Sequence, residues 1–134
     1  MVINSNRFNF AETVQEYLKG YKGMTVEALT AVIPQVAKES AKKLQQASPK
    51  KSGKYAKGWT YKAEKGRIRV GATVYGKDPT YRLAHLLEYG HAKRGGDRMP
   101  VEGIEHIAPV AEWAQDEAVN RMFDYLEEHM GYDL

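Results

Sequence analysis

Trp59-Thr60-Tyr61-Lys62-Ala63-Glu64-Lys65-Gly66-Arg67-Ile68-Arg69-Val70-Gly71-Ala72-Thr73-Val74 is the stretch that decides the fold class of this chain. Apolar residues alternate with polar ones from Trp59 onward, and the same alternation runs from Ile68 to Val74. Period-two patterning around a turn at Lys65-Gly66 predicts a β-hairpin with one buried face. Because two strands rarely stand alone, we expect another strand or a packed helix to cover them.

A long helix is predicted before the hairpin, from about Thr25 to Ala47. Six of its residues recur at helical spacing and form the stripe that we expect to face the core: Val26, Leu29, Ile33, Val36, Ser40 and Leu44. Pro34 lies inside this pattern, so we expect a kink or a restart of the helix there. Ser48-Pro49 ends it.

Three further helices are predicted from their end signals. Asn9 and Glu12 have the spacing of a capping box for a short helix that runs to about Gly20. A second short helix carries His85 and is closed by Gly90. The last helix begins near Pro109, which suits a first helical turn, and turns its acidic residues outward.

Together these elements predict an α+β fold, in which a long N-terminal helix and a C-terminal helix pack on a small antiparallel β-sheet. The length of 134 residues indicates a single domain, residues 1–134. Within it, residues 1–24 are expected to form an N-terminal extension with a short helix. Residues 91–103 are rich in glycine and charge and are expected to form a flexible loop.

Composition excludes several classes of site. The chain has no cysteine, so disulfides and thiolate metal sites are excluded. No apolar run approaches the roughly 20 residues that cross a bilayer, and we expect no membrane partner. The first residues lack the apolar stretch of a signal peptide, which predicts synthesis in the cytoplasm.

Charge is distributed unevenly along the chain, although the net charge is only +3. Residues 42–69, the basic block, hold ten Lys or Arg and one acid, so their charge is 10 − 1 = +9. Residues 101–134, the acidic block, hold one Arg and nine acids, so their charge is 1 − 9 = −8. The two blocks could pair within one chain, pair between neighbouring copies, or form two solvated faces.

Two histidines and a glutamate lie close together at His85, Glu88 and His91. Residues three apart are neighbours on a helix, so His85 and Glu88 share a face, and His91 could fold back toward them. Such a set could hold a metal and serve a metal-dependent hydrolase or nuclease, with His106 as a further partner. The spacing differs from that of the zinc motif His-Glu-x-x-His, and a histidine between leucines is more often structural. We therefore expect no metal, no cofactor and no catalytic residue.

A lysine-rich segment could contact DNA. Its basic residues are interleaved with Tyr55 and Trp59, whose rings could stack on bases, and they are Lys50, Lys51, Lys54 and Lys57. The two rings are four residues apart and Trp59 begins a strand, so both could equally belong to the core. Contact with DNA would in that case be non-specific and electrostatic.

Three motifs in order resemble one protein family. The first is Ser48-Pro49-Lys50-Lys51-Ser52-Gly53-Lys54-Tyr55-Ala56-Lys57-Gly58-Trp59 and the second is Tyr81-Arg82-Leu83-Ala84-His85-Leu86-Leu87-Glu88-Tyr89-Gly90-His91. The third is a basic Gly-Gly loop at residues 93–98, followed by His106-Ile107-Ala108-Pro109. Over about residues 25–130 the chain resembles the phage head–tail joining family typified by the tenth gene product of the lambdoid phage Hong Kong ninety-seven. The first twenty residues do not align.

The resemblance implies a non-enzymatic structural protein of a long-tailed bacteriophage. It would act as a connector, neck or tail-completion component at the head–tail junction of the virion, after synthesis in the host cytoplasm. Its partners would be further copies in a hexameric or dodecameric ring around the DNA passage, and other connector and tail proteins. The residues expected at its interfaces are Lys50, Lys51, Lys54, Lys57, Lys93, Arg94 and Arg98. Those expected to be structural are Gly53, Trp59, His85, Glu88, Gly90, His91, His106 and Pro109.

Overall fold

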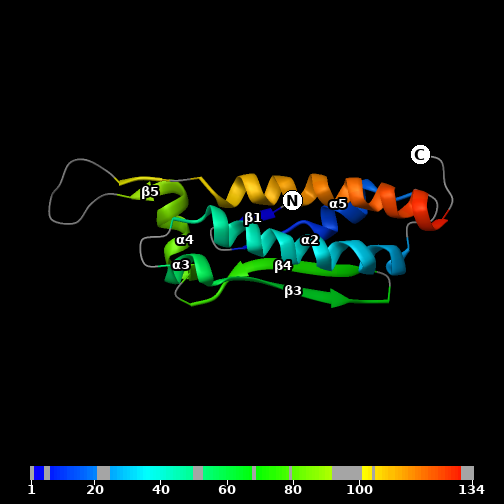
Figure 1. Cartoon of the computed structure of the whole chain (residues 1–134), viewed down its shortest axis with the longest axis horizontal. Coiled ribbons are helices and arrows are strands. Elements are labelled where there is room, and N and C mark those ends of the chain that lie inside the picture. Colours follow the sequence, from blue (N-terminus) through cyan, green and yellow to red (C-terminus); the bar gives the residue numbers. More distant parts are fainter. Residues whose placement is uncertain are drawn as a thin grey trace.

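The architecture is described from a computed structural model of the chain. The structure describes residues 2–4, 7–20, 25–49, 53–67, 69–78, 80–91, 101–103 and 105–130. Helices and a small sheet lie along one long axis (Figure 1). The fold is α+β, as predicted.

An antiparallel sheet with the order β1-β2-β4-β3 forms one layer. The predicted hairpin is confirmed as β3 (Trp59–Lys65) and β4 (Val70–Gly76), which pair with Trp59 opposite Gly76 and Lys65 opposite Val70. In the turn, Gly66 donates its N–H to the carbonyl of Arg69 at 2.8 Å. The turn of the hairpin therefore lies where the alternating sequence predicted it.

Only one strand of the hairpin has the predicted buried face. In β4, Val70, Ala72 and Val74 are buried in strict alternation. In β3 the prediction is wrong beyond Trp59, because Tyr61 and Ala63 are exposed. β3 is the edge strand of the sheet, and the exposure of both residues indicates that the helices do not cover this part of the edge.

The N-terminal segment joins the main sheet. β1 (Val2–Asn4) pairs with β2 (Arg7–Asn9), and β2 pairs with β4, with Phe8 opposite Val74. Phe8 is buried in the core, so this segment extends the buried layer of the hairpin. These two short strands were not predicted, since three-residue strands carry too few positions to show a period.

The long helix is confirmed. α2 (Val26–Ala47) begins at Thr25, whose side chain accepts the Ala28 N–H, and ends at Ser48. It runs through Pro34 without interruption, so the helix does not restart there. Five members of the predicted stripe are buried: Leu29, Ile33, Val36, Ser40 and Leu44. α2 packs on β3 and β4 on one side and on the last helix on the other.

The shorter helices begin and end close to the predicted residues. α1 (Ala11–Tyr17) has no capping box: Asn9 accepts the N–H of Ala11 at 3.1 Å, and the cap residue, Phe10, offers no side-chain hydrogen bond. It also ends before Gly20. α4 (Thr80–Tyr89), after the hairpin, ends beside Gly90, as predicted, whereas α3 (Lys54–Lys57), before the hairpin, was not predicted.

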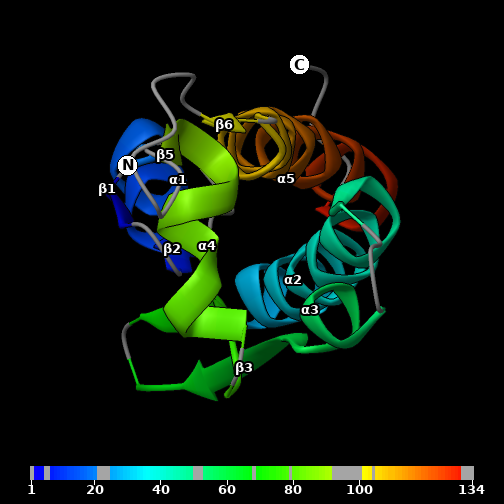
Figure 2. The same cartoon turned by 90° about the vertical axis from the view of Figure 1, so that its left-hand side faces the viewer.

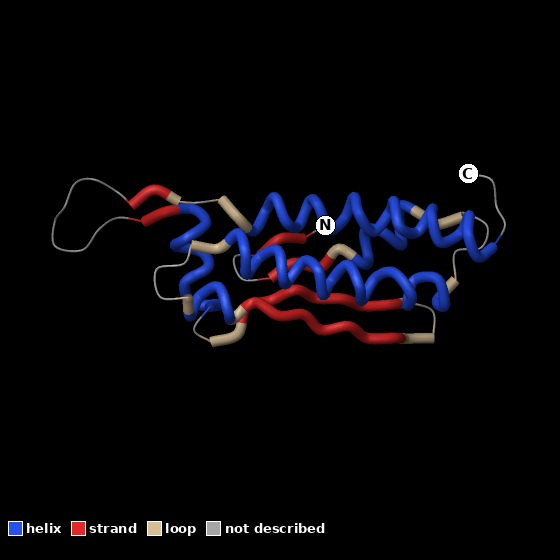
Figure 3. The backbone as a smooth tube through the Cα atoms, viewed as in Figure 1, coloured by secondary structure: helices blue, strands red, loops and turns tan. Residues whose placement is uncertain are grey.

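A two-stranded sheet and the last helix complete the fold. β5 (Gly90–His91) pairs with β6 (Val101–Glu102), so strands form both ends of the segment predicted as a loop, whose residues 92–100 lie outside the described part. α5 (Ile107–Met130) places Pro109 in its first turn, as predicted. α5 lies along α2 on the side away from the hairpin, and α4 crosses one end of the molecule (Figures 2 and 3).

Candidate functional site

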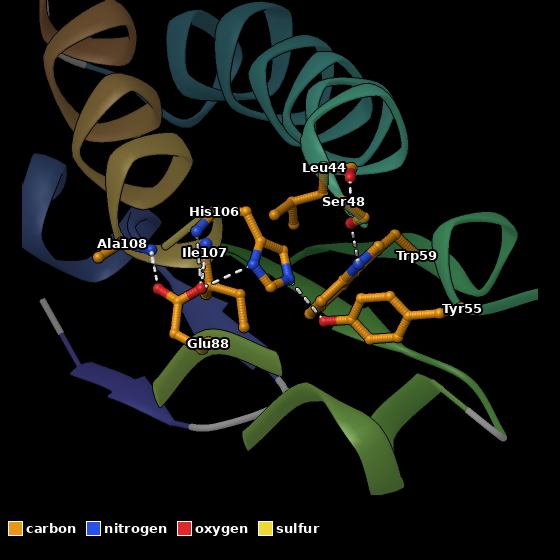
Figure 4. Close-up of polar contacts among 8 residues, drawn as sticks. All are labelled: Leu44, Ser48, Tyr55, Trp59, Glu88, His106, Ile107 and Ala108. Carbon is orange, nitrogen blue, oxygen red and sulfur yellow. Dashed lines mark hydrogen bonds and ion pairs between the residues drawn. The ribbon is translucent and has the colours of Figure 1, made fainter. Parts of the chain in front are cut away.

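Glu88 caps the start of the last helix. Its side chain leaves α4 and its Oε1 accepts the backbone N–H groups of His106 at 2.7 Å and Ile107 at 2.9 Å. Its Oε2 accepts the N–H of Ala108 at 3.1 Å. The first N–H groups of a helix have no partner within it, and a carboxylate there is further stabilised by the helix dipole. A side chain of α4 therefore caps the N-terminus of α5 (Figure 4).

A buried chain of hydrogen bonds continues from this carboxylate. His106 Nδ1 lies 2.8 Å from Glu88 Oε1, and His106 Nε2 lies 2.6 Å from the Tyr55 hydroxyl. A proton on Nδ1 satisfies the carboxylate and leaves Nε2 to accept the Tyr55 hydroxyl. All three residues are buried, with 2–6% of their surface exposed. The chain therefore joins α3, α4 and the residue before α5.

Tyr55 is held in its protonated form. Burial of the phenol raises the pKa of Tyr55 well above its ordinary value, and the nearby Glu88 carboxylate raises it further. A phenol that keeps its proton remains a hydrogen-bond donor to His106. The Tyr55, His106 and Glu88 series has the order of an acid–base relay, but a buried, fully hydrogen-bonded series of this kind serves to hold segments together.

A second buried hydrogen-bond series fastens the hairpin to α2. Trp59 Nε1 donates to Ser48 Oγ at 3.0 Å, and Ser48 Oγ in turn donates to the carbonyl of Leu44. Trp59 and His106 lie edge-on to the Tyr55 ring, with centroid distances from it of 6.0 and 5.6 Å. Figure 4 shows both series meeting at these three rings. Tyr55 and Trp59 are thus core residues, and the hypothesis that they stack on bases is wrong.

Glycine makes two close features of this region possible. Gly53 has φ of +81°, a left-handed conformation that other residues adopt at a cost, and it begins α3. Gly58 approaches Thr80 so closely that a Cβ at Gly58 would lie 1.7 Å from the Thr80 Oγ1. That hydroxyl donates to the carbonyl of Tyr55 at 2.7 Å. The start of α4 is therefore fastened directly to α3.

Of the candidate metal ligands His85, Glu88 and His91, which were not expected to hold a metal, the structure describes the side chain of Glu88. Glu88 turns to the start of α5, whereas the side chains of His85 and His91 lie outside the described part. Among the residues whose placement is described, no group of three His, Asp or Glu could hold a metal. The hydrogen-bond partners of the Glu88 carboxylate belong to His106 and to the first residues of α5. No described helix is long and apolar enough to cross a membrane.

Most of the predicted basic interface lies beyond what the structure describes. Lys50, Lys51 and the whole of residues 92–100, with Lys93, Arg94 and Arg98, are outside it. Lys54 and Lys57 lie on α3, and both are exposed.

The ion pairs of the two charged blocks are formed within one block or with residues outside both blocks. In the basic block, Arg69 lies 3.7 Å from Glu12 and Lys62 lies 3.0 Å from Glu64. In the acidic block, Arg121 of α5 pairs with Glu39 of α2 and with Glu117 of its own helix. Lys43 of the basic block contacts a ring of the acidic block, because its ammonium lies 4.4 Å from the Trp113 ring centre.

Most acids of the last helix face solvent. Those with exposed side chains are Glu112, Asp116, Asp124, Glu127 and Glu128. The prediction that α5 turns its acids outward is confirmed, since its buried side consists of residues such as Val110, Ala114 and Met122.

A family model matches the chain over residues 12–90, more than half of its length. It is the HK97-gp10-like model, described as "Bacteriophage HK97-gp10, putative tail-component". The chain belongs to this family. No curated protein and no solved structure matches it.

The matched residues cover α1 to α4 and the hairpin of this HK97-gp10-like protein. The match begins before residue 25, where the resemblance was expected to begin, and ends before His106 and Pro109. Glu88 is inside the match and its partner His106 is outside it. The sequence offered one signal for Tyr55, the four-residue spacing to Trp59 that indicated two core rings, but none for its bond to His106.

Proposed function

We propose that this protein is a non-enzymatic structural component of the head–tail junction of a long-tailed phage. Membership of a family described as a tail component supports a structural role in the virion. The observation that carries the proposal is the use of Glu88, His106 and Tyr55. These acid–base residues are buried and hydrogen-bonded to each other and to the start of α5, so we infer that they stabilise the fold.

The finer part of the proposal is assembly as a ring around the DNA passage. The exposed acids of α5 and the exposed lysines of α3 provide opposite charges on one chain. Head-to-tail contact between opposite charges of neighbouring copies is heterologous, and it closes into a ring when the rotation between copies permits. A hexamer or dodecamer would follow, in contact with other connector and tail proteins.

Deletion of the gene from the parent phage tests this place in the virion. We expect DNA-filled heads separate from tails, or tails of abnormal length, when the lysate is viewed by electron microscopy. The wild-type gene supplied from a plasmid should restore joined particles. Normal, infectious particles from the deletion would contradict the proposal.

The electrostatic contact is tested separately in the same complementation assay. The Lys54→Glu, Lys57→Glu double variant should reduce joined particles, whereas the Lys19→Glu, Lys38→Glu double variant, an equal charge change outside the basic block, should not. If the double variant restores particles as well as the wild-type gene does, the basic block is not part of the ring contact. The place of the protein in the virion would still stand on the deletion.

Two other functions are less well supported. A metal-dependent hydrolase or nuclease built on His85, Glu88 and His91 would need Glu88, whose oxygens accept three backbone N–H groups at α5. A DNA-binding module would have to use its basic side chains without stacking by Tyr55 and Trp59, since both rings are buried. Salt-sensitive DNA binding that is lost in the lysine double variant would favour that second function.

A further inference from the structure

Among the described strands, β3 is paired on one side only. In the sheet order β1-β2-β4-β3, no described strand pairs with β3 on the side away from β4. Residues 61–65 of β3 are exposed, and the strand follows the outer margin of the molecule in two perpendicular views (Figures 1 and 2). An unpaired edge presents backbone donors and acceptors to any strand that can match it.

The hydrogen bonds at the start of β3 show which backbone groups face this edge. Lys77 donates its N–H to the carbonyl of Gly58 at 2.8 Å, so Gly58 directs that group toward β4. The carbonyl of Trp59, the next residue, points away from β4 and accepts a hydrogen bond from Gln45 Nε2 at 2.8 Å. In an antiparallel ladder these two orientations alternate along the strand. The backbone N–H and C=O groups of every second residue after Trp59 therefore point away from β4.

The outward-facing residues are Tyr61, Ala63 and Lys65. Their N–H and C=O groups point away from β4, and Gln45 occupies only the carbonyl of Trp59. The side chains of the residues between them, Lys62 and Glu64, lie on one face of the strand. They form an ion pair of 3.0 Å, and about two thirds of each side chain is exposed.

We propose that this edge pairs with the same edge of a second copy of the chain, in an antiparallel register centred on Ala63. In that register Ala63 lies opposite Ala63 of the second copy, and Tyr61 lies opposite Lys65. These are hydrogen-bonded pairs, since both members direct their backbone groups outward. The charged residues then lie opposite their complements, Lys62 opposite Glu64 in both halves of the contact. The edge is therefore complementary to itself.

Charge also rejects the neighbouring registers. A shift of two residues in one direction puts Lys62 opposite Lys62, and a shift in the other direction puts Glu64 opposite Glu64. Like charges directly opposite one another destabilise a strand pair, and opposite charges stabilise it. Charged side chains usually protect an edge from pairing, but the order Lys62, Ala63, Glu64 instead selects one antiparallel partner.

The contact is isologous, so it closes with two copies and forms one continuous sheet across them. It differs from the charged surfaces proposed for the ring, which lie on α3 and α5, and it is independent of the place of the protein in the virion. The purified full-length chain should sediment as a dimer, at twice its 15.1 kDa mass, with dissociation on dilution. A monomer at every concentration up to millimolar would overturn the pairing.

Reversal of one charge tests the register. Lys62→Glu puts two carboxylates opposite each other in both halves of the contact and should raise the dissociation constant about tenfold or more. Glu64→Lys should do the same. The double variant Lys62→Glu, Glu64→Lys restores complementary pairs and should restore the dimer, whereas Lys38→Glu on α2 should leave it unchanged. Equal behaviour of the single and double variants would overturn the register.

Ala63→Pro tests the backbone part of the contact. The N–H of Ala63 faces away from β4, so proline removes no bond within the sheet and is tolerated best at such an edge position. The variant should keep the helical circular dichroism spectrum of the wild type and sediment as a monomer. If it remains a folded dimer, the two copies do not pair through β3.

Discussion

Glu88 and His106 are joined twice, once through the backbone and once through the side chain. The carboxylate accepts the His106 backbone N–H at 2.7 Å and lies 2.8 Å from the His106 Nδ1, across 18 residues of sequence. The same oxygen accepts the N–H of Ile107, so α4 and α5 meet at a single buried group. A buried carboxylate with several donors is stable only while all of them remain in place.

Removal of this carboxylate should destabilise the whole fold. We expect Glu88→Ala to lower the free energy of unfolding by about 3 kcal/mol, because the N–H groups of His106, Ile107 and Ala108 lose their acceptor. Glu88→Gln keeps one oxygen and should cost less. Urea unfolding followed by circular dichroism measures both, with the exposed α5 residue Glu112 changed to Ala as the control. Equal stability of Glu88→Ala and the wild type would mean that the helix cap contributes nothing.

Loss of the Tyr55 hydroxyl should have an effect that depends on alkaline pH. Tyr55→Phe removes the hydroxyl that donates to the buried His106 Nε2 and should cost about 1–3 kcal/mol at pH 7. The folded state raises the pKa of Tyr55, so this group stabilises the fold fully below about pH 10 and progressively less as the pH rises toward the folded pKa.

The difference between the wild type and Tyr55→Phe should therefore shrink above pH 10, by up to about 1 kcal/mol per pH unit. Urea unfolding of both proteins at several pH values measures this difference. The range from about pH 8 to about pH 11 brackets the ordinary tyrosine pKa. The exposed tyrosine on α1, changed as Tyr17→Phe, is the control for the loss of a tyrosine hydroxyl at the surface. A constant difference for Tyr55→Phe would contradict the raised pKa.

Gly58 should not tolerate even a methyl group. In Gly58→Ala the new Cβ would lie 1.7 Å from Thr80 Oγ1 and 2.6 Å from Thr80 Cβ, and Thr80 is fully buried. Overpacking of this kind costs about 1–3 kcal/mol. Gly71→Ala is the matched control, because its Cβ would meet Glu64 Cβ at an ordinary 3.7 Å. Thermal unfolding of the two variants should separate them clearly, and similar midpoints would show that Thr80 can move aside.

The ion pair between Glu39 and Arg121 should make a small contribution that is lost in acid. The hydrogen bond from Arg121 is the largest cause that lowers the pKa of Glu39. A lowered pKa stabilises the fold above about pH 4.5, the ordinary value, and this stabilisation disappears as the pH falls through the folded pKa.

Because the Glu39 side chain is 43% exposed, we expect Glu39→Gln to cost only about 0.5–1 kcal/mol at pH 7. The cost should vanish near the acid end of the stability curve. Glu16→Gln, on an exposed face of α1, is the control in the same urea titrations. A cost that persists unchanged in acid would mean that the Glu39→Gln variant is penalised for its packing and not for the lost charge.

The sequence determined the features that depend on local periodicity. The stripe from Leu29 to Leu44 predicted α2 and its buried side, because one helical turn is enough to decide which residues share a face. The alternation of Val70, Ala72 and Val74 predicted the buried face of β4 for the same reason. The end of α2 at Ser48 followed from the proline after it.

Tertiary structure decided the features that depend on which segments meet. Tyr61 and Ala63 have the same alternation as the residues of β4, yet they are exposed, because β3 lies at the edge of the sheet and only the sheet order reveals an edge. Glu88 stands near His85 and His91 in sequence, but its partner is His106. That pairing depends on how α4 and α5 cross, and no local pattern encodes the crossing of two helices joined by a long connection.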